Sequence, residues 1–162
     1  MSARRLLSAA LAALSLGAAL LAGCTPPPAA HLTTPDGFAA LDKQTDYVYR
    51  AASAEGVVVA IRTEENRPKS TLDFWAGALD QQLRQTRYMP DGQASDVKAQ
   101  GGLAGKQLRY TRDDGGRTYR FWMTVFVTAD RVWVIEAGGD KERFTGAAEE
   151  RVKKAIDSFA ID

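Results

Sequence analysis

Two stretches in the second half of the chain carry apolar side chains at consecutive positions instead of alternate ones. Residues 121–127 and 132–135 are the clearest cases, and each contains a tryptophan. A strand that is solvated on one face alternates polar and apolar residues, so a strand that is apolar on both sides needs cover on both. The sequence therefore predicts a sheet with helices packed on each of its faces.

The neighbouring strand segments predict that this sheet is antiparallel. Short connections join them, and the clearest is Asp113-Asp114-Gly115-Gly116. Acidic residues beside glycine supply the positive φ that a tight hairpin turn requires. Alternation and β-branched content predict strands over residues 46–52, 56–64, 94–99, 106–112, 117–127 and 131–137.

Two helices are predicted from apolar residues at helical spacing. The first follows Pro68, takes Ser70 as its N-cap and ends near Thr86. The second starts after Asp140 and carries an apolar stripe down to Phe159, which we expect to face the core. Together with the strands, they predict an α+β fold in which an antiparallel β-sheet is covered by helices on both faces, an α/β/α sandwich.

The N-terminal segment has the organisation of an export signal. Arg4 and Arg5 precede an apolar run over residues 6–21, and Leu21-Ala22-Gly23-Cys24 follows. This segment resembles the lipobox of bacterial lipoproteins. The resemblance implies a signal peptide over residues 1–23, cleavage before Cys24, and lipid, palmitate included, on the Cys24 sulfur.

Two alternatives to this interpretation stay open. In the first, residues 6–21 form an uncleaved transmembrane helix, although spanning needs about 20 strongly apolar residues and this run is shorter and diluted by Ala, Gly and Ser. Arg4-Arg5 also resembles a twin-arginine export signal.

Proline-rich sequence follows the lipid cysteine. We expect residues 24–35 to form an extended tether, at about 3.1 Å per residue, and residues 36–162 to form one domain.

The scarcity of cysteine and histidine excludes several kinds of chemistry. Cys24 is the only cysteine, and His31, in the predicted tether, is the only histidine. A Ser-His-Asp or Cys-His nucleophile system and a zinc site built on His and Cys are therefore out of reach, and we expect no metal and no cofactor. The chain has 21 Lys and Arg against 20 Asp and Glu, which argues against nucleic acid as a partner.

The segment around the 113–116 turn reads as a mirror image. A hairpin symmetric about Asp114 and Gly115 would set identical residues opposite each other, including two pairs of arginines. Like charges directly opposite destabilise a sheet. One interpretation is an anion-binding site, because guanidinium groups suit carboxylate or phosphate. The other is that the arginines splay into water, with Trp122 accepting one guanidinium on its ring face. The candidate ligand-binding residues are Arg109, Arg112, Arg117 and Arg120.

Carboxylates offer a second set of candidates. Glu136 lies within an otherwise apolar strand, so we expect an ion pair with Arg109 or Arg120, or a strand end that reaches water. Adjacent pairs such as Glu64-Glu65 do not face each other across a cleft, as glycosidase chemistry requires, so no catalytic residue is assigned.

The order of the predicted elements resembles a known fold. An early hairpin, a helix beginning Leu72-Asp73-Phe74-Trp75, an antiparallel meander and a closing helix ending Ala155-Ile156-Asp157-Ser158-Phe159 are similar to the PsbP-like domains, including bacterial lipoproteins of the DcrB type. The resemblance implies a binding or assembly role in the envelope and carries no catalytic residues.

We therefore expect a lipid-anchored protein of the cell membrane or outer membrane, with its domain facing the periplasm or the exterior. Its expected role is that of a non-catalytic binding or assembly module for an envelope protein. The alternatives are a carrier of a small anionic ligand and a carboxylate-based enzyme acting on envelope glycans.

Overall fold

An antiparallel sheet of eight strands forms the centre of the domain. The computed structural model describes residues 29–42 and 46–162. The strand order is β2-β3-β4-β9-β8-β7-β5, and β6 pairs with β7 beside β5. The bounds are β2 Phe38–Ala40, β3 Tyr49–Ser53, β4 Val58–Glu65, β5 Met89–Pro90, β6 Ser95–Lys98, β7 Ala104–Asp114, β8 Arg117–Val127 and β9 Arg131–Asp140.

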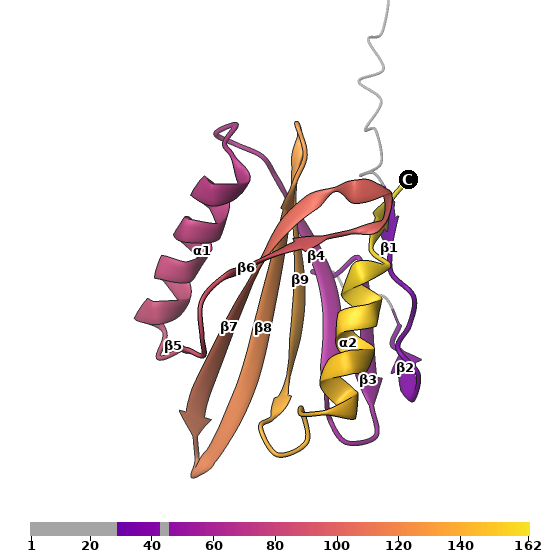
Figure 1. Cartoon of the computed structure of the whole chain (residues 1–162), viewed down its shortest axis with the longest axis vertical. Coiled ribbons are helices and arrows are strands. Elements are labelled where there is room, and N and C mark those ends of the chain that lie inside the picture. Colours follow the sequence, from indigo (N-terminus) through magenta and orange to yellow (C-terminus); the bar gives the residue numbers. More distant parts are fainter. Residues whose placement is uncertain (1–28, 43–45) are drawn as a thin grey trace, which may run out of the picture.

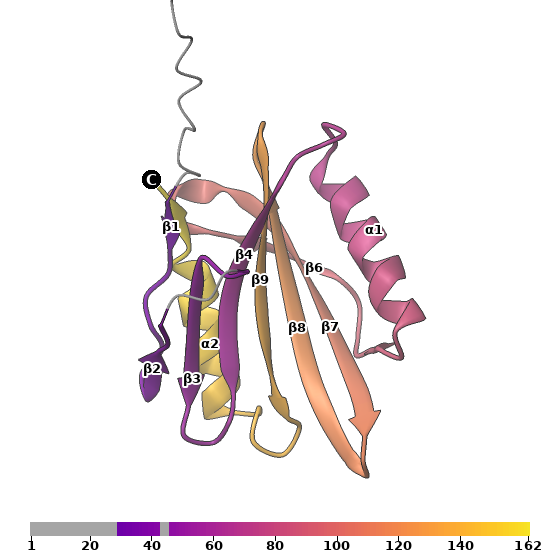
Figure 2. The same ribbon diagram turned by 180° about the vertical axis from the view of Figure 1, so that it is seen from behind.

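Two helices and a small second sheet complete the described chain. Helix α1 spans Leu72–Gln85, helix α2 spans Ala147–Asp157, and a short 3₁₀ helix, η1, spans Gln100–Gly102. Strand β1, Ala30–His31, pairs with β10, Ala160–Ile161, and joins the two ends of the described chain. Figure 1 and the reverse view in Figure 2 show α1 and α2 at separate positions on the sheet.

Consecutive residues of the central strands point to opposite faces, and each face is covered. Trp122 packs in the cluster beneath α2, whereas Met123 packs in the cluster beneath α1, and both are buried. The predicted α/β/α sandwich of the α+β class is therefore confirmed. Its central strands carry apolar side chains on both faces, and a helix covers each face.

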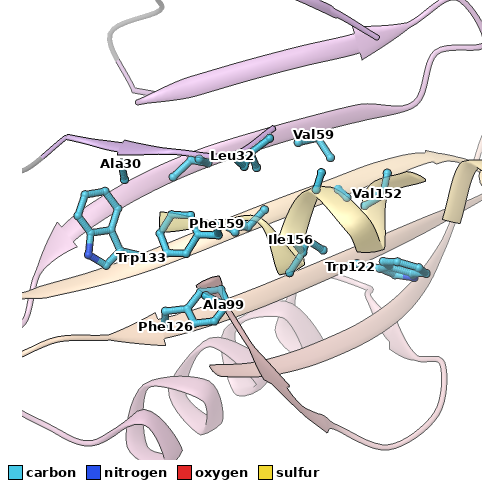
Figure 3. Packing of buried hydrophobic residues seen from close by; sticks show 14 of the residues in the cluster. Ala30, Leu32, Val59, Ala99, Trp122, Phe126, Trp133, Val152, Ile156 and Phe159 are labelled. Atoms are coloured by element: carbon cyan, nitrogen blue, oxygen red, sulfur yellow. The ribbon is translucent and has the colours of Figure 1, made fainter. Parts of the chain in front are cut away.

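Helix α2 covers the larger of the two cores. Its apolar stripe meets large aromatic side chains from β8 and β9, as Figure 3 shows. Phe159 stacks on Phe126 with ring centroids 5.0 Å apart and lies 6.0 Å from Trp133. The main contributors from α2 and the residues after it are Ala148, Val152, Ala155, Ile156 and Phe159.

Helix α1 covers the smaller core and has a different N-cap from the one predicted. The Thr71 side chain accepts a hydrogen bond from the Phe74 N–H, which makes Thr71 the cap in place of Ser70. Ser70 lies one residue before this cap, and its backbone N–H and C=O both bond to the side chain of Asn66. The core residues from α1 are Leu72, Trp75, Ala76, Leu79 and Leu83.

The second helix begins later than predicted. Gly138, Gly139 and Asp140 extend β9, opposite Phe121, Arg120 and Tyr119 of β8, and α2 starts only at Ala147. Glycine at position 139 lies within the strand, where the surroundings leave little room for a side chain. A Cβ at Gly139 would lie 3.1 Å from a methyl group of Val57.

The boundary of the predicted tether at residue 35 is also wrong. Ala30 and His31 pair with Ile161 and Ala160, and Leu32 is buried in the α2 core. The Thr33 N–H donates to Ser158 Oγ over 2.8 Å. The folded domain therefore begins at about Ala30. The signal peptide, Cys24 and the first part of the tether lie outside the described residues.

No helix within the described ranges is both long and apolar enough to cross a membrane.

Candidate functional site

The register of the β7–β8 hairpin differs from the predicted one by two residues. Asp114 lies opposite Arg117, so the turn consists of Gly115 and Gly116, whose φ values are 59° and 80°. A two-residue turn with positive φ at both positions matches the twist of the strands, and glycine adopts it without steric cost. The predicted pairing of identical residues is therefore wrong. The observed pairs are Arg109 with Trp122, Tyr110 with Phe121, Thr111 with Arg120, and Arg112 with Tyr119.

The four candidate arginines are divided between the two faces of the sheet. Because side chains alternate along a strand, Arg109 and Arg120 point toward α2, and Arg112 and Arg117 point to the face that carries α1. The arrangement does not bring all four together around one anion. The ligand-binding role assigned to them stays a prediction.

The two arginines on the α2 face are committed to contacts within the fold. The Arg109 guanidinium lies 4.3 Å from the centroid of the Trp122 ring, as the alternative interpretation of the hairpin expects, and its Nε donates to Gln107 Oε1. The Arg120 side chain is 18% exposed, donates to the Phe144 carbonyl and pairs with Glu149 of α2. The Arg120 contacts attach α2 and the segment before it to the sheet, whereas the Arg109 contacts lie within the sheet.

Glu136 pairs with a different arginine from those predicted. Its Oε1 accepts a hydrogen bond from Arg62 Nε over 2.8 Å. Arg62 on β4 is the diagonal neighbour of Glu136, since Ala60 lies directly opposite it. Arg109 and Arg120 point to the other face of the sheet, so neither can reach Glu136.

On the α1 face, the end of the hairpin adjoins an open hollow. We call it the aromatic hollow, and its volume is about 270 Å³. Tyr88 lies against Phe121 with ring centroids 5.2 Å apart, and the Arg112 guanidinium lies 5.5 Å from the Tyr88 centroid. Tyr119, at 36% exposure, forms its outer side. The lining residues are Tyr88, Arg112, Asp114, Tyr119, Arg120, Phe121, Gly138 and Gly139.

The hollow exists because neither helix α1 nor a side chain at position 138 covers this part of the sheet surface. Helix α1 ends at Gln85, and the chain turns back toward the sheet through Arg87, which has a φ of 67°. Gly138 has no side chain to fill the floor, and a Cβ there would lie 3.4 Å from the Phe121 ring. Sequence reasoning missed the roles of Tyr88 and Gly138. The alternation of β8, which places residues 117, 119 and 121 on one face, is the signal that could have indicated the site.

A hydrogen-bonded chain beside the hollow fixes the wall that Tyr88 forms. The Tyr110 hydroxyl donates to Asp80 Oδ1 over 2.6 Å, and Arg84 Nε donates to Asp80 Oδ2 over 2.8 Å. The Tyr110 ring packs edge-on against Tyr88, with centroids 6.2 Å apart. Helix α1 and strand β7 are thereby joined next to the hollow.

The same contacts shift two pKa values. Burial opposes ionisation of Asp80, but the hydrogen bonds from Tyr110 and Arg84 outweigh it and lower the pKa of the carboxyl. Burial, together with the hydrogen bond to Asp80, raises the pKa of the Tyr110 hydroxyl above its usual range. A tyrosine held protonated in this way serves to attach the helix and is poorly suited to act as a base.

Across residues 29–42 and 46–162, no three His, Cys, Asp or Glu side chains group closely enough to hold a metal ion. His31 lies on β1, where Nδ1 is 3.3 Å from an Asp162 carboxylate oxygen, and Figure 1 shows β1 at the opposite end of the sheet from the hairpin tip.

The fold is thus an α+β domain with an antiparallel sheet between two helices, and solved structures share it. LpqN, involved in cell envelope biogenesis of Mycobacterium tuberculosis, matches with a TM-score of 0.68 at 15% identity, over 86% of this chain and 87% of that one.

Two further structures match more weakly. A Pseudomonas aeruginosa protein of unknown function, PA94, described as a putative regulator, has a TM-score of 0.53 at 10% identity, over 77% of this chain and 82% of that one. A Bacteroides thetaiotaomicron structure has a TM-score of 0.51 at 8% identity, over 83% of this chain and 45% of that one.

No protein-family model and no curated protein sequence matches the chain. The structural likenesses establish the fold. The resemblance to PsbP-like, DcrB-type proteins stays a prediction.

Proposed function

We propose that this chain is a lipid-anchored protein of the cell envelope, held through Cys24, whose domain is a non-catalytic docking module for an envelope protein. The match to LpqN, a protein involved in cell envelope biogenesis, supports the cellular setting. The lipobox-like segment Leu21-Ala22-Gly23-Cys24 supports the anchor.

The aromatic hollow is the observation that carries the docking role. Tyrosine and arginine are the residue types that most often dominate the energy of protein interfaces, and the hollow presents both. Arg112 and Tyr119 lie directly opposite each other on paired strands, so the framework that holds them is rigid. Specific ligand pockets usually enclose about 300–1,000 Å³ and bury most of the ligand. Because the hollow is open and does not enclose its contents, it fits one or two side chains of a partner better than a carried small molecule.

Two carboxylates of the described domain are engaged within the fold, which fits a role without catalysis. Glu136 is paired with Arg62, and Asp80 is bound by Tyr110 and Arg84. Each of these carboxylates stabilises contacts between elements of the fold, which leaves neither of them free to transfer protons to a substrate.

Crosslinking in living cells tests the docking site. A photo-crosslinking amino acid replaces Tyr119 in the hollow, and in a matched control it replaces Lys153, which is exposed on α2. We expect a discrete adduct from position 119 and none from position 153. Two further changes should remove the adduct: Gly138→Val, which fills the floor of the hollow with a residue that favours strands, and Arg112→Glu, with Lys153→Glu as its charge control.

An adduct from position 119 that survives both Gly138→Val and Arg112→Glu would place docking outside the hollow.

A second experiment tests lipid attachment at Cys24. We expect Cys24→Ser to move the protein from the membrane fraction to the soluble fraction, and an unchanged distribution would contradict lipid attachment at Cys24.

A further inference from the structure

We infer that the domain is held with one defined end against the membrane that carries its anchor, so that the aromatic hollow faces away from that membrane. This inference rests on the proposed lipidation of Cys24. It follows from the length of chain between the lipid and the first ordered strand, and from the positions of that strand and the hollow on the domain.

The chain between the lipid and the domain is short. Strand β1 begins at Ala30, which pairs with Ile161, and Leu32 is buried behind it. Six residue steps separate Cys24 from Ala30 in the sequence. A chain spans at most about 3.3–3.6 Å per residue, so Ala30 lies no more than about 20 Å from the lipid-bearing residue in any conformation.

The attachment point and the hollow lie at opposite ends of the sheet. We call one end the anchor end; it consists of β1, the 66–71 connection between β4 and α1, and the 128–130 turn between β8 and β9. Figure 1 shows the 66–71 connection and the 128–130 turn at the top, β1 in the upper part at the right, and the tip of the β7–β8 hairpin at the bottom. Strand β8 has 11 residues, from Arg117 near the tip to Val127 near the anchor end. At about 3.3 Å per residue it is roughly 33 Å long.

These two lengths exclude one orientation. If the hairpin tip touched the membrane, Ala30 would stand about 30 Å above it, which exceeds the reach of about 20 Å. A tether ending at residue 35 would have nearly doubled the reach and permitted that orientation. The pairing of β1 with β10 therefore keeps the hairpin tip off the membrane, and on this ground we assign the anchor end to the lipid surface.

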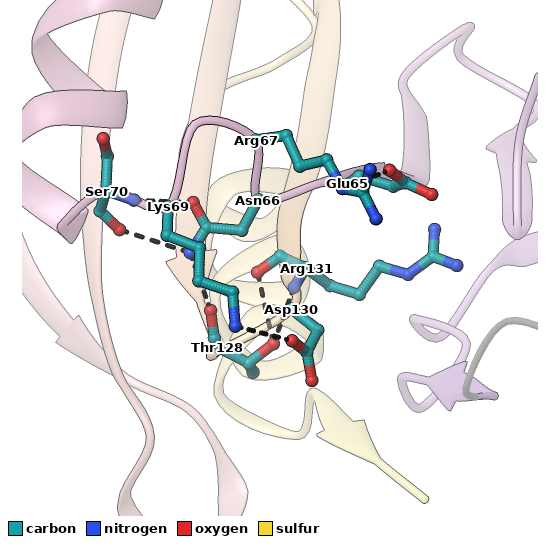
Figure 4. Close-up of polar contacts among 8 residues, drawn as sticks. All are labelled: Glu65, Asn66, Arg67, Lys69, Ser70, Thr128, Asp130 and Arg131. Carbon is teal, nitrogen blue, oxygen red and sulfur yellow. Dashed lines mark hydrogen bonds and ion pairs between the residues drawn. The ribbon is translucent and has the colours of Figure 1, made fainter.

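Hydrogen bonds hold the loops of the anchor end together, and opposite charges on its surface form ion pairs. Asn66 is buried and its side chain donates to the carbonyls of Ser70 and Thr128, which locks the connection to the turn, as Figure 4 shows. Lys69 pairs with Asp130 over 3.3 Å on the surface. A patch of balanced charge meets little repulsion from anionic headgroups.

One large apolar side chain is exposed at the anchor end. Phe74, in the first turn of α1, is 51% exposed. An exposed aromatic ring near the lipid surface favours contact with the interface. The short tether supplies a high effective concentration, so this contact needs little affinity of its own.

Fluorescence quenching on the lipidated full chain tests the orientation. Because Cys24 is the only cysteine and its sulfur is consumed by lipid, one introduced cysteine gives a unique thiol. Lys69→Cys places it at the anchor end and Asp114→Cys at the hairpin tip; both side chains are exposed. Each protein is labelled with an environment-sensitive fluorophore in vesicles of phosphatidylcholine and phosphatidylglycerol that contain lipids with a nitroxide on the headgroup.

We expect the label at position 69 to lose most of its fluorescence and the label at position 114 to lose almost none. Inserting twelve Gly and Ser residues after Thr25 lengthens the tether beyond the length of the domain and should reduce the difference. Equal quenching at the two positions in membrane-bound protein would overturn the inference and leave the anchor intact. Protein that does not sediment with the vesicles would overturn both.

Discussion

The hydrogen bond between Tyr110 and Asp80 offers the sharpest test of how α1 is held beside the hollow. Tyr110 on β7 is 1% exposed, and its hydroxyl is 2.6 Å from an Asp80 carboxylate oxygen on α1. Tyr110→Phe removes the hydroxyl and keeps the ring, so no cavity of consequence forms. The change in stability therefore reports the hydrogen bond itself.

The expected loss at neutral pH is about 1.5 kcal/mol. A hydrogen bond to a charged group contributes about 1.5–3 kcal/mol. The lower end applies because the Asp80 side chain is 26% exposed and keeps its hydrogen bond from Arg84 over 2.8 Å. Loss of the Tyr110 partner therefore leaves the carboxylate partly compensated.

The loss should depend on pH in a defined direction. The pKa of Tyr110 is raised above its ordinary value of 10.0, so the stability it contributes is present below pH 10 and declines as the pH rises further. The slope is at most about 1.4 kcal/mol per pH unit for one proton. The pKa of Asp80 is lowered from 3.8, so its contribution is present above that value and is lost as the pH falls below it.

Urea unfolding followed by tryptophan fluorescence at pH 3, 7 and 10.5 measures these effects. Tyr119→Phe, an exposed change in the same hairpin, is the control and should unfold like the wild type. We expect the difference between wild type and Tyr110→Phe to be largest at pH 7 and smaller at both extremes. A difference below about 0.5 kcal/mol at pH 7, or one unchanged at pH 10.5, would refute the reasoning.

Three further predictions concern two glycines and the N-cap of α1, and can be measured by thermal or urea unfolding. Gly105→Ala should destabilise the domain by about 3 kcal/mol, because the new Cβ would lie 2.4 Å from the Phe126 ring. Gly77→Ala, in α1 with open space around it, should instead stabilise by about 0.5–1 kcal/mol, and a loss there would mean that the helix is packed differently. Thr71→Ala should cost about 1 kcal/mol and Ser70→Ala much less, whereas equal losses would restore Ser70 as the cap.

The sandwich could be predicted from the sequence because a strand that is buried on both faces has apolar side chains at consecutive positions. Trp122 and Met123 are neighbours in the chain, yet one packs in the α2 core and the other in the α1 core. A strand with one wet face would place a polar residue at one of these two positions. The fold class therefore follows from a local pattern, without knowledge of distant contacts.

The hairpin register could not be predicted from that same pattern. A slip of two residues keeps every side chain on its original face, so apolar alternation does not distinguish the two registers. Only the turn and the cross-strand pairs distinguish them. The observed register centres on Gly115 and Gly116 and sets Asp114 opposite Arg117, which avoids the repulsive arginine pairs of the predicted one.

The start of the domain was missed for a different reason. Proline-rich composition favours an extended chain, and residues before 29 lie outside the described ranges. Ala30 and His31, however, find their partners at Ile161 and Ala160, at the far end of the sequence. A strand pair between segments this distant is a tertiary contact, and no local property of residues 30–35 reports it.

The place of the candidate site follows from the length of α1 and from where it lies on the sheet. Helix α1 has 14 residues and is about 21 Å long, whereas β8 has 11 residues and is roughly 33 Å long. A helix laid along these strands must leave roughly 12 Å of their face uncovered, and the aromatic hollow lies where α1 stops. On the opposite face, the contacts of Arg120 with Glu149 and the Phe144 carbonyl use the arginine to attach α2. Whether a hairpin arginine holds the fold together or faces a partner is thus decided by which helix extends over it.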